Sequence, residues 1–156
     1  MTKLSKIFIL FSLFIFISNC GYTPIFSKKD VNFSIENIKF LGDKDVKQKI
    51  SHALSSYKNK PNKEKKISLV IKNSKNTSVA SKDSKGKAQT KRINIDSNVK
   101  IILAENNFFQ KSFNKSSTYT VIDRKSELKL IENKLIENLS NEIALQIIFE
   151  ILKNTK

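Results

Sequence analysis

The chain has 156 residues and a formal net charge of +15, from 29 Lys and Arg against 14 Asp and Glu. This length fits one domain preceded by a targeting segment, and the hydrophobic fraction of 39% is enough for a core without cross-links. The single cysteine, Cys20, excludes an internal disulfide and therefore every disulfide-stapled fold.

The first twenty residues have the features of an export signal. Lys3 and Lys6 form a positive n-region, and an apolar core follows over 7–17. This core is shorter than the roughly 20 residues that a membrane-spanning helix needs. A plain secretory signal with an incidental cysteine and an uncleaved anchor are the two alternative interpretations.

The end of this segment explains the position of the cysteine. Ile17-Ser18-Asn19-Cys20 resembles a bacterial lipobox, in which the cysteine thiol is acylated and the cysteine becomes the first residue of the mature chain. We therefore expect a signal peptide over 1–19, lipid attachment at Cys20 and a lipidated tether over 20–30. More than one acyl chain makes such anchoring stable. The next residue is Gly21 and not the Asp that retains lipoproteins in the inner membrane, which favours the outer membrane.

The elements expected after the tether begin with a strand and a helix. Apolar residues alternate over 31–40, with a change of phase that predicts a bulge near Glu36-Asn37. Gly42-Asp43 gives a turn and an N-cap for a helix over 44–58. A polar loop over 58–66 separates this helix from a second strand at 67–71.

The next part of the chain is expected to contain two more strands. The segment 72–91 is polar and Lys-rich, with Gly86 as a turn residue, and it is interpreted as a loop. Apolar residues share one parity over 93–103, which predicts a half-buried strand. After a turn at 105–107, a strand is expected over 108–122, interrupted at 114–116.

The last segment changes from a two-residue period to a helical one. Apolar residues recur at spacings of three and four from Leu128 to Leu152, which predicts one amphipathic helix over about 125–153. The order is strand, helix, three strands, helix. We expect a single α+β domain over 31–156, with two helices on one face of a four-stranded, largely antiparallel sheet.

Enzyme chemistry has no support in these residues. The only histidine, His52, lies away from the apolar stripe of its helix and is expected to be solvated. No Cys/His or Ser/His/Asp set, glycine-rich phosphate loop or metal-ligand spacing is present. The sequence predicts no catalytic residue, no bound metal and no cofactor.

The positive charge is concentrated in one part of the chain. Residues 58–92 hold twelve basic residues and two acidic ones, with no aromatic residue among them. Lys ammonium groups bind phosphate as point charges, whereas single-stranded nucleic-acid sites interleave aromatic residues for base stacking. An anion-binding surface is one interpretation. Codon bias is the other, since Lys, Asn and Ile all have A/T-rich codons.

The mature N-terminus resembles the lipopolysaccharide-assembly lipoprotein LptE family. Residues 20–26, Cys-Gly-Tyr-Thr-Pro-Ile-Phe, match the family's C-G-[FY]-x-P-[LIM]-[FY] opening, and the expected element order agrees as well. The resemblance implies a periplasm-facing outer-membrane lipoprotein that plugs the β-barrel LptD and assists the insertion of lipopolysaccharide. It also implies contact with the glycolipid through basic residues. By position and charge the candidates are Lys82, Lys85, Lys87, Lys91 and Arg92.

Other functions remain open. The chain has features that also suit an accessory lipoprotein of another envelope lipid-transport system, or an envelope lipoprotein with no barrel partner. A periplasmic nucleic-acid-binding protein is a third possibility that the missing aromatic residues disfavour. Co-purification of a large barrel distinguishes the first of these functions from the others.

Overall fold

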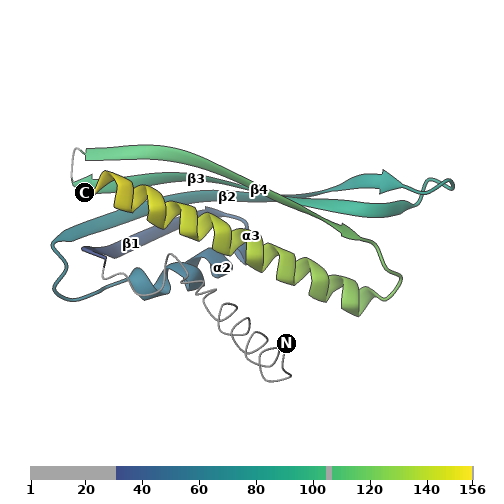
Figure 1. Cartoon of the computed structure of the whole chain (residues 1–156), viewed down its shortest axis with the longest axis horizontal. Helices are drawn as coiled ribbons and strands as arrows, with labels where there is room; N and C mark the ends of the chain where they lie inside the picture. The colour runs from purple at the N-terminus through teal and green to yellow at the C-terminus, as the bar shows by residue number, and fades with distance from the viewer. Residues whose placement is uncertain (1–30, 105–106, 156) are drawn as a thin grey trace, which may run out of the picture. The chain divides into compact units, whose positions relative to one another are not determined.

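The computed structural model describes residues 31–104 and 107–155. The expected signal peptide and tether, and most of the turn expected at 105–107, lie outside these residues. Four strands and two long helices follow one another in the order β-α-β-β-β-α (Figure 1). They are β1 (Phe33–Gly42), α2 (Lys44–Leu54), the short 3-10 helix η2 (Ser55–Tyr57), β2 (Lys65–Lys82), β3 (Ala88–Ala104), β4 (Asn107–Thr120) and α3 (Lys125–Asn154).

The strands form one mixed sheet in the order β1-β2-β3-β4. β2 pairs antiparallel with β3, and β3 pairs antiparallel with β4, whereas β1 and β2 are parallel. The parallel pair follows from the chain order, because two strands joined through a helix return in the same direction. The expected α+β fold with a largely antiparallel sheet is therefore confirmed.

Two local features of β1 and α2 agree with the sequence. The register of β1 against β2 shifts between Ile35 and Asn37, where the bulge was expected. Asp43 is the N-cap of α2, and its Oδ1 accepts hydrogen bonds from the backbone N–H groups of Asp45 and Val46, both at 3.0 Å. These bonds satisfy donors that the first turn of a helix leaves unpaired.

The interpretation of 72–91 as a loop is wrong. β2 continues to Lys82 and β3 starts at Ala88, so most of this segment is a regular two-stranded ladder. Apart from Val79 and Ala80, the residues of β2 beyond Lys75 are polar on both faces, so they carry no alternation of the kind that marks a half-buried strand. Gly86 does lie in the turn, with φ +78°.

β4 also differs from its expected form. The strand is continuous through Asn114, Lys115 and Ser116, where an interruption was expected. Lys115 lies on the side of β4 that faces α3, and its Nζ is 3.1 Å from Glu142 Oε2. A charged residue at this position broke the apolar pattern in the sequence, while in the fold the helix supplies its partner.

The core lies between one face of the sheet and both helices. Its largest fully buried side chains come from strands and from both helices: Phe33, Ile35, Ile50, Leu54, Ile67, Leu69, Ile71, Ile93, Ile95, Ile101, Ile143 and Ile147. Burial in β2 and β3 alternates with period two over their inner parts, so the opposite face of the sheet carries the more exposed residues, most of them polar. We call that opposite face, which neither α2 nor α3 covers, the open face.

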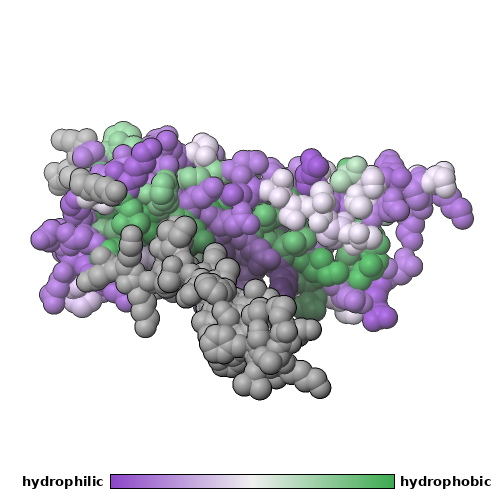
Figure 2. All heavy atoms as spheres, in the orientation of Figure 1, coloured by the Kyte–Doolittle hydropathy of each residue, from purple (hydrophilic) through white to green (hydrophobic). Residues whose placement is uncertain are grey.

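α3 runs along the sheet from the β2–β3 hairpin to the end where β1 begins (Figure 1). Its deeply buried residues are confined to the later two thirds of the helix: Ile136, Leu139, Ser140, Ile143, Ala144, Ile147, Ile148 and Ile151. The first turns hold Leu128, Ile131 and Leu135, which are only partly buried, and Leu130, which is 68% exposed. Figure 2 shows an apolar area over this part of the helix.

Candidate functional site

The β2–β3 hairpin ends in a turn that its own side chains and backbone fix in place. Asp83 Oδ1 accepts hydrogen bonds from the backbone N–H groups of Lys85 and Lys87, both at 2.9 Å. The backbone adds bonds from Gly86 N to Asp83 O and from Asp83 N to Lys87 O. Ser81 Oγ and Thr90 Oγ1 meet across the two strands at 2.7 Å. The turn is therefore ordered by specific contacts.

The five predicted glycolipid residues all lie at this end of the hairpin. We call this set the basic hairpin end: Lys82, Lys85, Lys87, Lys91 and Arg92. Lys82 is the last residue of β2, and the next two lysines belong to the turn. The sequence neighbours Lys91 and Arg92 belong to β3, with Lys91 opposite Val79 and Tyr119, and Arg92 opposite Ser78 and Thr118.

The structure divides this set between two faces of the sheet. Successive residues of a strand point to opposite sides, so Lys91 lies on the helix side and Arg92 on the open face. Lys91 is half-buried, whereas Arg92 is exposed. A single flat ligand cannot contact all five side chains, but an extended polyanion that wraps the hairpin can.

Two carboxylates lie close to the basic hairpin end. Asp83 is used in the turn, and Asp123 Oδ1 is 3.0 Å from Lys87 Nζ. The Lys87 and Asp123 side chains are 69% and 95% exposed, and ion pairs at such positions contribute about 0–1 kcal/mol. The end of the hairpin keeps a positive charge that is open to solvent.

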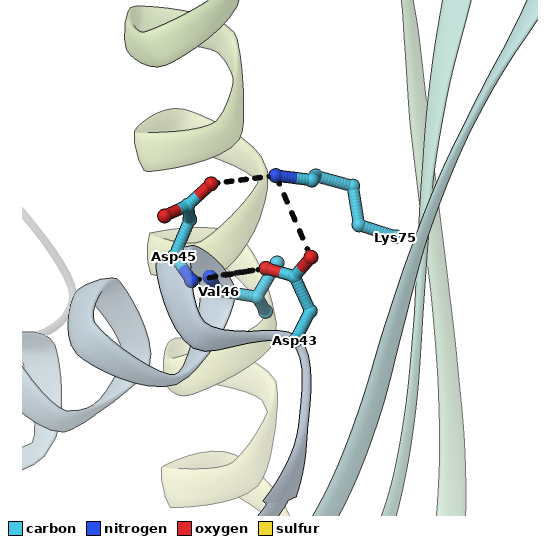
Figure 3. A network of polar contacts seen from close by, with 4 residues as sticks. All are labelled: Asp43, Asp45, Val46 and Lys75. Atoms are coloured by element: carbon cyan, nitrogen blue, oxygen red, sulfur yellow. Dashed lines mark hydrogen bonds and ion pairs between the residues drawn. The ribbon is translucent and has the colours of Figure 1, made fainter.

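A second polar cluster joins the start of α2 to the sheet (Figure 3). Lys75 Nζ on β2 is 2.7 Å from Asp45 Oδ2 and 3.5 Å from Asp43 Oδ2. The hydrogen bond and the charge of Lys75 lower the pKa of Asp45. Burial alone would lower the pKa of Lys75, but Asp45 and Asp43 outweigh burial and raise it. Asp45 and Lys75 are therefore both charged at neutral pH, and their ion pair fixes the start of the helix on the sheet.

A third polar contact ties the start of α3 to β4. The Tyr119 hydroxyl donates to Glu132 Oε1, and Tyr119 itself is only 7% exposed. Burial, and then the hydrogen bond and charge of Glu132, raise the pKa of Tyr119 well above its usual value. The phenol therefore stays protonated at every physiological pH, and its hydrogen bond joins α3 to β4.

The remaining predicted residues are exposed or lie outside the described part of the chain. His52 is exposed in the last turn of α2, as expected. Cys20 lies outside the described residues. Among residues 31–104 and 107–155, no group of three or more His, Cys, Asp or Glu is placed to hold a metal ion. Within the same ranges, no helix is both long enough and apolar enough to cross a membrane.

One group of basic residues was not found from the sequence. Lys39, Lys72 and Lys100 come from three different strands and lie on the open face of the sheet. Each occupies a polar position in its own strand, which alone gives no sign of a cluster. Only the register of β1 on β2 and of β2 on β3 brings them together.

No family model and no curated protein sequence matches this chain. Solved structures do match its fold. Rare lipoprotein B from Shewanella oneidensis is 11% identical, with a TM-score of 0.54 over 77% of this chain and 98% of that one. An uncharacterized lipoprotein B from Nitrosomonas europaea is 13% identical, with a TM-score of 0.57 over 83% and 90%.

A minor lipoprotein from Acinetobacter baumannii is similar to the same degree. It is 13% identical, with a TM-score of 0.54 over 77% of this chain and 92% of that one. At these identities the likeness shows the fold. The chain therefore has the fold of these bacterial lipoproteins over nearly all of their length.

Proposed function

We propose that this chain is an outer-membrane lipoprotein of the LptE type, anchored through acylated Cys20 and facing the periplasm. In this proposal it plugs the barrel LptD and assists the insertion of lipopolysaccharide into the outer membrane. One coincidence carries the proposal. The expected mature N-terminus, Cys-Gly-Tyr-Thr-Pro-Ile-Phe, resembles the LptE family, and the same chain has the fold of rare lipoprotein B.

The basic hairpin end is the proposed glycolipid contact. Lys82, Lys85 and Lys87 are exposed in or beside an ordered turn, and phosphate groups of a glycolipid headgroup are suitable partners for their ammonium groups. Individual surface lysines bind weakly in water and are screened by salt. Several of them acting on one multiply charged headgroup add up to a useful affinity. The role is non-catalytic, in keeping with a sequence that supplies no catalytic set.

Replacement of all five basic hairpin residues by Gln is expected to weaken lipopolysaccharide binding by at least about tenfold at low salt. The free energy of unfolding should stay close to wild type, because four of the five positions are exposed and such positions seldom contribute more than about 0.5 kcal/mol each, while Lys91 is only half-buried. Binding is measured by titration of the full chain with lipopolysaccharide, and stability by urea unfolding.

A second variant with the same loss of charge serves as the control. It replaces five exposed lysines of the helices by Gln: Lys44, Lys47, Lys125, Lys134 and Lys153. This variant should keep most of its affinity. If both variants bind lipopolysaccharide as tightly as the wild-type chain does, the basic hairpin end is not a contact, and codon bias accounts for its lysines.

The anchor and the barrel are tested together by purification from membranes. After chemical cross-linking in cells, the chain should be extracted with a large outer-membrane barrel protein attached. Intact-mass analysis of the uncrosslinked chain should show acyl chains on a polypeptide that begins at Cys20. Substitution Cys20→Ser should block maturation or release the domain from the membrane.

Each part of this test has its own contrary result. Retention of residues 1–19, or a free thiol at Cys20, excludes the lipoprotein function. An acylated chain with no barrel attached assigns the protein instead to an accessory lipoprotein of another envelope lipid-transport system.

A further inference from the structure

The open face of the sheet carries its own basic patch, separate from the basic hairpin end. In the registers of β1 on β2 and of β2 on β3, Val70 lies between Lys39 on one side and Lys100 on the other. Neighbouring strands are about 4.8 Å apart, so the two lysines start about 10 Å from each other. Lys72, two residues along β2 from Val70, points to the same face.

Apolar side chains are interleaved with these lysines. Leu41 is opposite Lys72 in the register and is 47% exposed. Phe108 is opposite Ile102, is 50% exposed, and lies 3.8 Å from the Lys100 ammonium, measured to the ring centroid. We call this set the open-face patch: Lys39, Leu41, Val70, Lys72, Lys100, Ile102 and Phe108. It extends across all four strands.

The positive charge of the open-face patch has no acidic partner within the described chain. None of its three lysines forms an ion pair there, whereas the acids at its borders are engaged elsewhere. Glu36 Oε1 is 3.0 Å from Lys66 Nζ, and Asp96 accepts hydrogen bonds from Asn94 and Asn114. Like charges gathered on one surface repel one another, so a bound anion would relieve this repulsion.

We infer that, while the chain is not seated in a barrel, the open-face patch docks on the surface of an anionic lipid bilayer. Charge complementarity supports this occupant, because lysines near an anionic bilayer surface are attracted to its phosphates. The interleaved Leu41, Val70 and Phe108 suit the boundary between headgroups and acyl chains, where apolar and basic side chains bind together. A purely polar anion would leave this apolar surface in water.

The tether is long enough for this arrangement. An extended chain covers at most about 3.6 Å per residue, so residues 20–30 can span up to about 40 Å. Lys39 lies eight positions after Val31, so even at the rise of a strand the two are no more than about 25 Å apart. The patch therefore reaches the bilayer in which Cys20 is anchored, and in this one respect the inference rests on the proposed function.

The chain contains no tryptophan, so the fluorescence of a single introduced tryptophan comes from that one position. We place it in the patch with Phe108→Trp, and as a reference on α3 with Phe149→Trp, where the native side chain is 56% exposed. The full-length lipidated chain is reconstituted into vesicles of phosphatidylcholine alone, or with an equal amount of phosphatidylglycerol. Quenching by brominated lipid measures contact between the indole and the bilayer.

Docking predicts quenching of the Phe108→Trp indole in the anionic vesicles, weak quenching in the neutral ones, and little quenching of the Phe149→Trp indole in either. We then add Lys39→Gln, Lys72→Gln and Lys100→Gln to the Phe108→Trp chain. The ratio of docked to undocked molecules in the anionic vesicles should fall on the order of 100-fold. The matched control Lys82→Gln, Lys85→Gln and Lys87→Gln removes the same charge from the hairpin turn and should keep the quenching.

The possible failures are distinguishable. A chain that does not float with either vesicle has no lipid anchor, which contradicts the proposed function. A chain that floats while its Phe108→Trp indole is unquenched overturns the docking inference alone. Equal loss of quenching in the two triple variants also overturns it, because the attraction would then depend on total charge and not on the patch. Equal quenching in neutral and anionic vesicles overturns it as well, because contact with the bilayer would then not depend on anionic lipid.

Discussion

The Leu139→Asp chain is expected to lose about 5 kcal/mol of unfolding free energy, enough to unfold a domain of ordinary stability. Leu139 is 5% exposed in the middle of α3, among residues that pack on the sheet. The substitution removes a buried apolar side chain and places a charge where no partner is available. Urea unfolding of the full chain, followed by far-UV circular dichroism, measures the loss.

The same substitution at Leu145 is the control. Leu145 belongs to the same helix and is 41% exposed, so Leu145→Asp should change stability by no more than about 0.5 kcal/mol. Identical unfolding midpoints for the two variants would mean that α3 does not pack on the sheet through Leu139. This contrast also separates a core helix from one that inserts into a membrane, since insertion would be impaired by both changes.

Gly42→Ala should cost about 3 kcal/mol or more, an unusually large effect for the addition of one methyl group. Gly42 ends β1 with φ +105°, a conformation that residues with a side chain rarely adopt. A Cβ here would overlap the backbone carbonyl oxygen of Asn73 on β2. That oxygen accepts a hydrogen bond from Asp43 N at 3.3 Å, so the N-cap of α2 would be displaced as well.

Gly86→Ala provides the comparison for backbone strain alone. Gly86 has φ +78° in the hairpin turn, and a Cβ there meets nothing within 4 Å. We expect a loss of about 1 kcal/mol, from the cost of positive φ without a clash. If urea unfolding gives equal losses for the two variants, the approach of Gly42 to Asn73 is not what makes glycine necessary.

The sequence predicted those elements in which burial against the core sets the spacing of the apolar residues. α3 was expected over 125–153 and runs over 125–154, because a long helix on a sheet repeats its apolar residues over many turns. The bulge in β1 was predicted from the change of phase in its apolar residues, and the register shifts at that point. The Asp43 N-cap was identified from local chemistry alone.

The outer part of the hairpin could not be predicted in this way. Residues 76–82 and 88–92 are exposed or half-buried. Because neither face of this part of the hairpin is packed in the core, its apolar and polar residues need not alternate. They are held by backbone pairing and by contacts such as Ser81 with Thr90. The five basic residues were expected in a loop, and they lie instead on an ordered turn and the two strands beside it.

The open-face patch could not be predicted from the sequence either, for a different reason. Lys39 and Lys72 are 33 positions apart in the sequence, and the register that aligns their strands depends on the bulge after Ile35. A shift of one residue would move Lys39 to the core side. Strand periodicity can place each lysine on a polar face, but pairing between strands decides which lysines become neighbours.

The position of β1 has a consequence for the order in which the chain folds. β2, β3 and β4 are joined in sequence through short connections, and such antiparallel pairs form fast because little chain entropy is lost on closure. β1 is at an edge, and its parallel pairing waits for the whole connection 43–64 to be in place. We therefore expect β1, the first stretch of the domain to be synthesised, to be among the last to join the sheet. Until β1 joins, β2 keeps one free edge, and that interval is when chaperones have access to it.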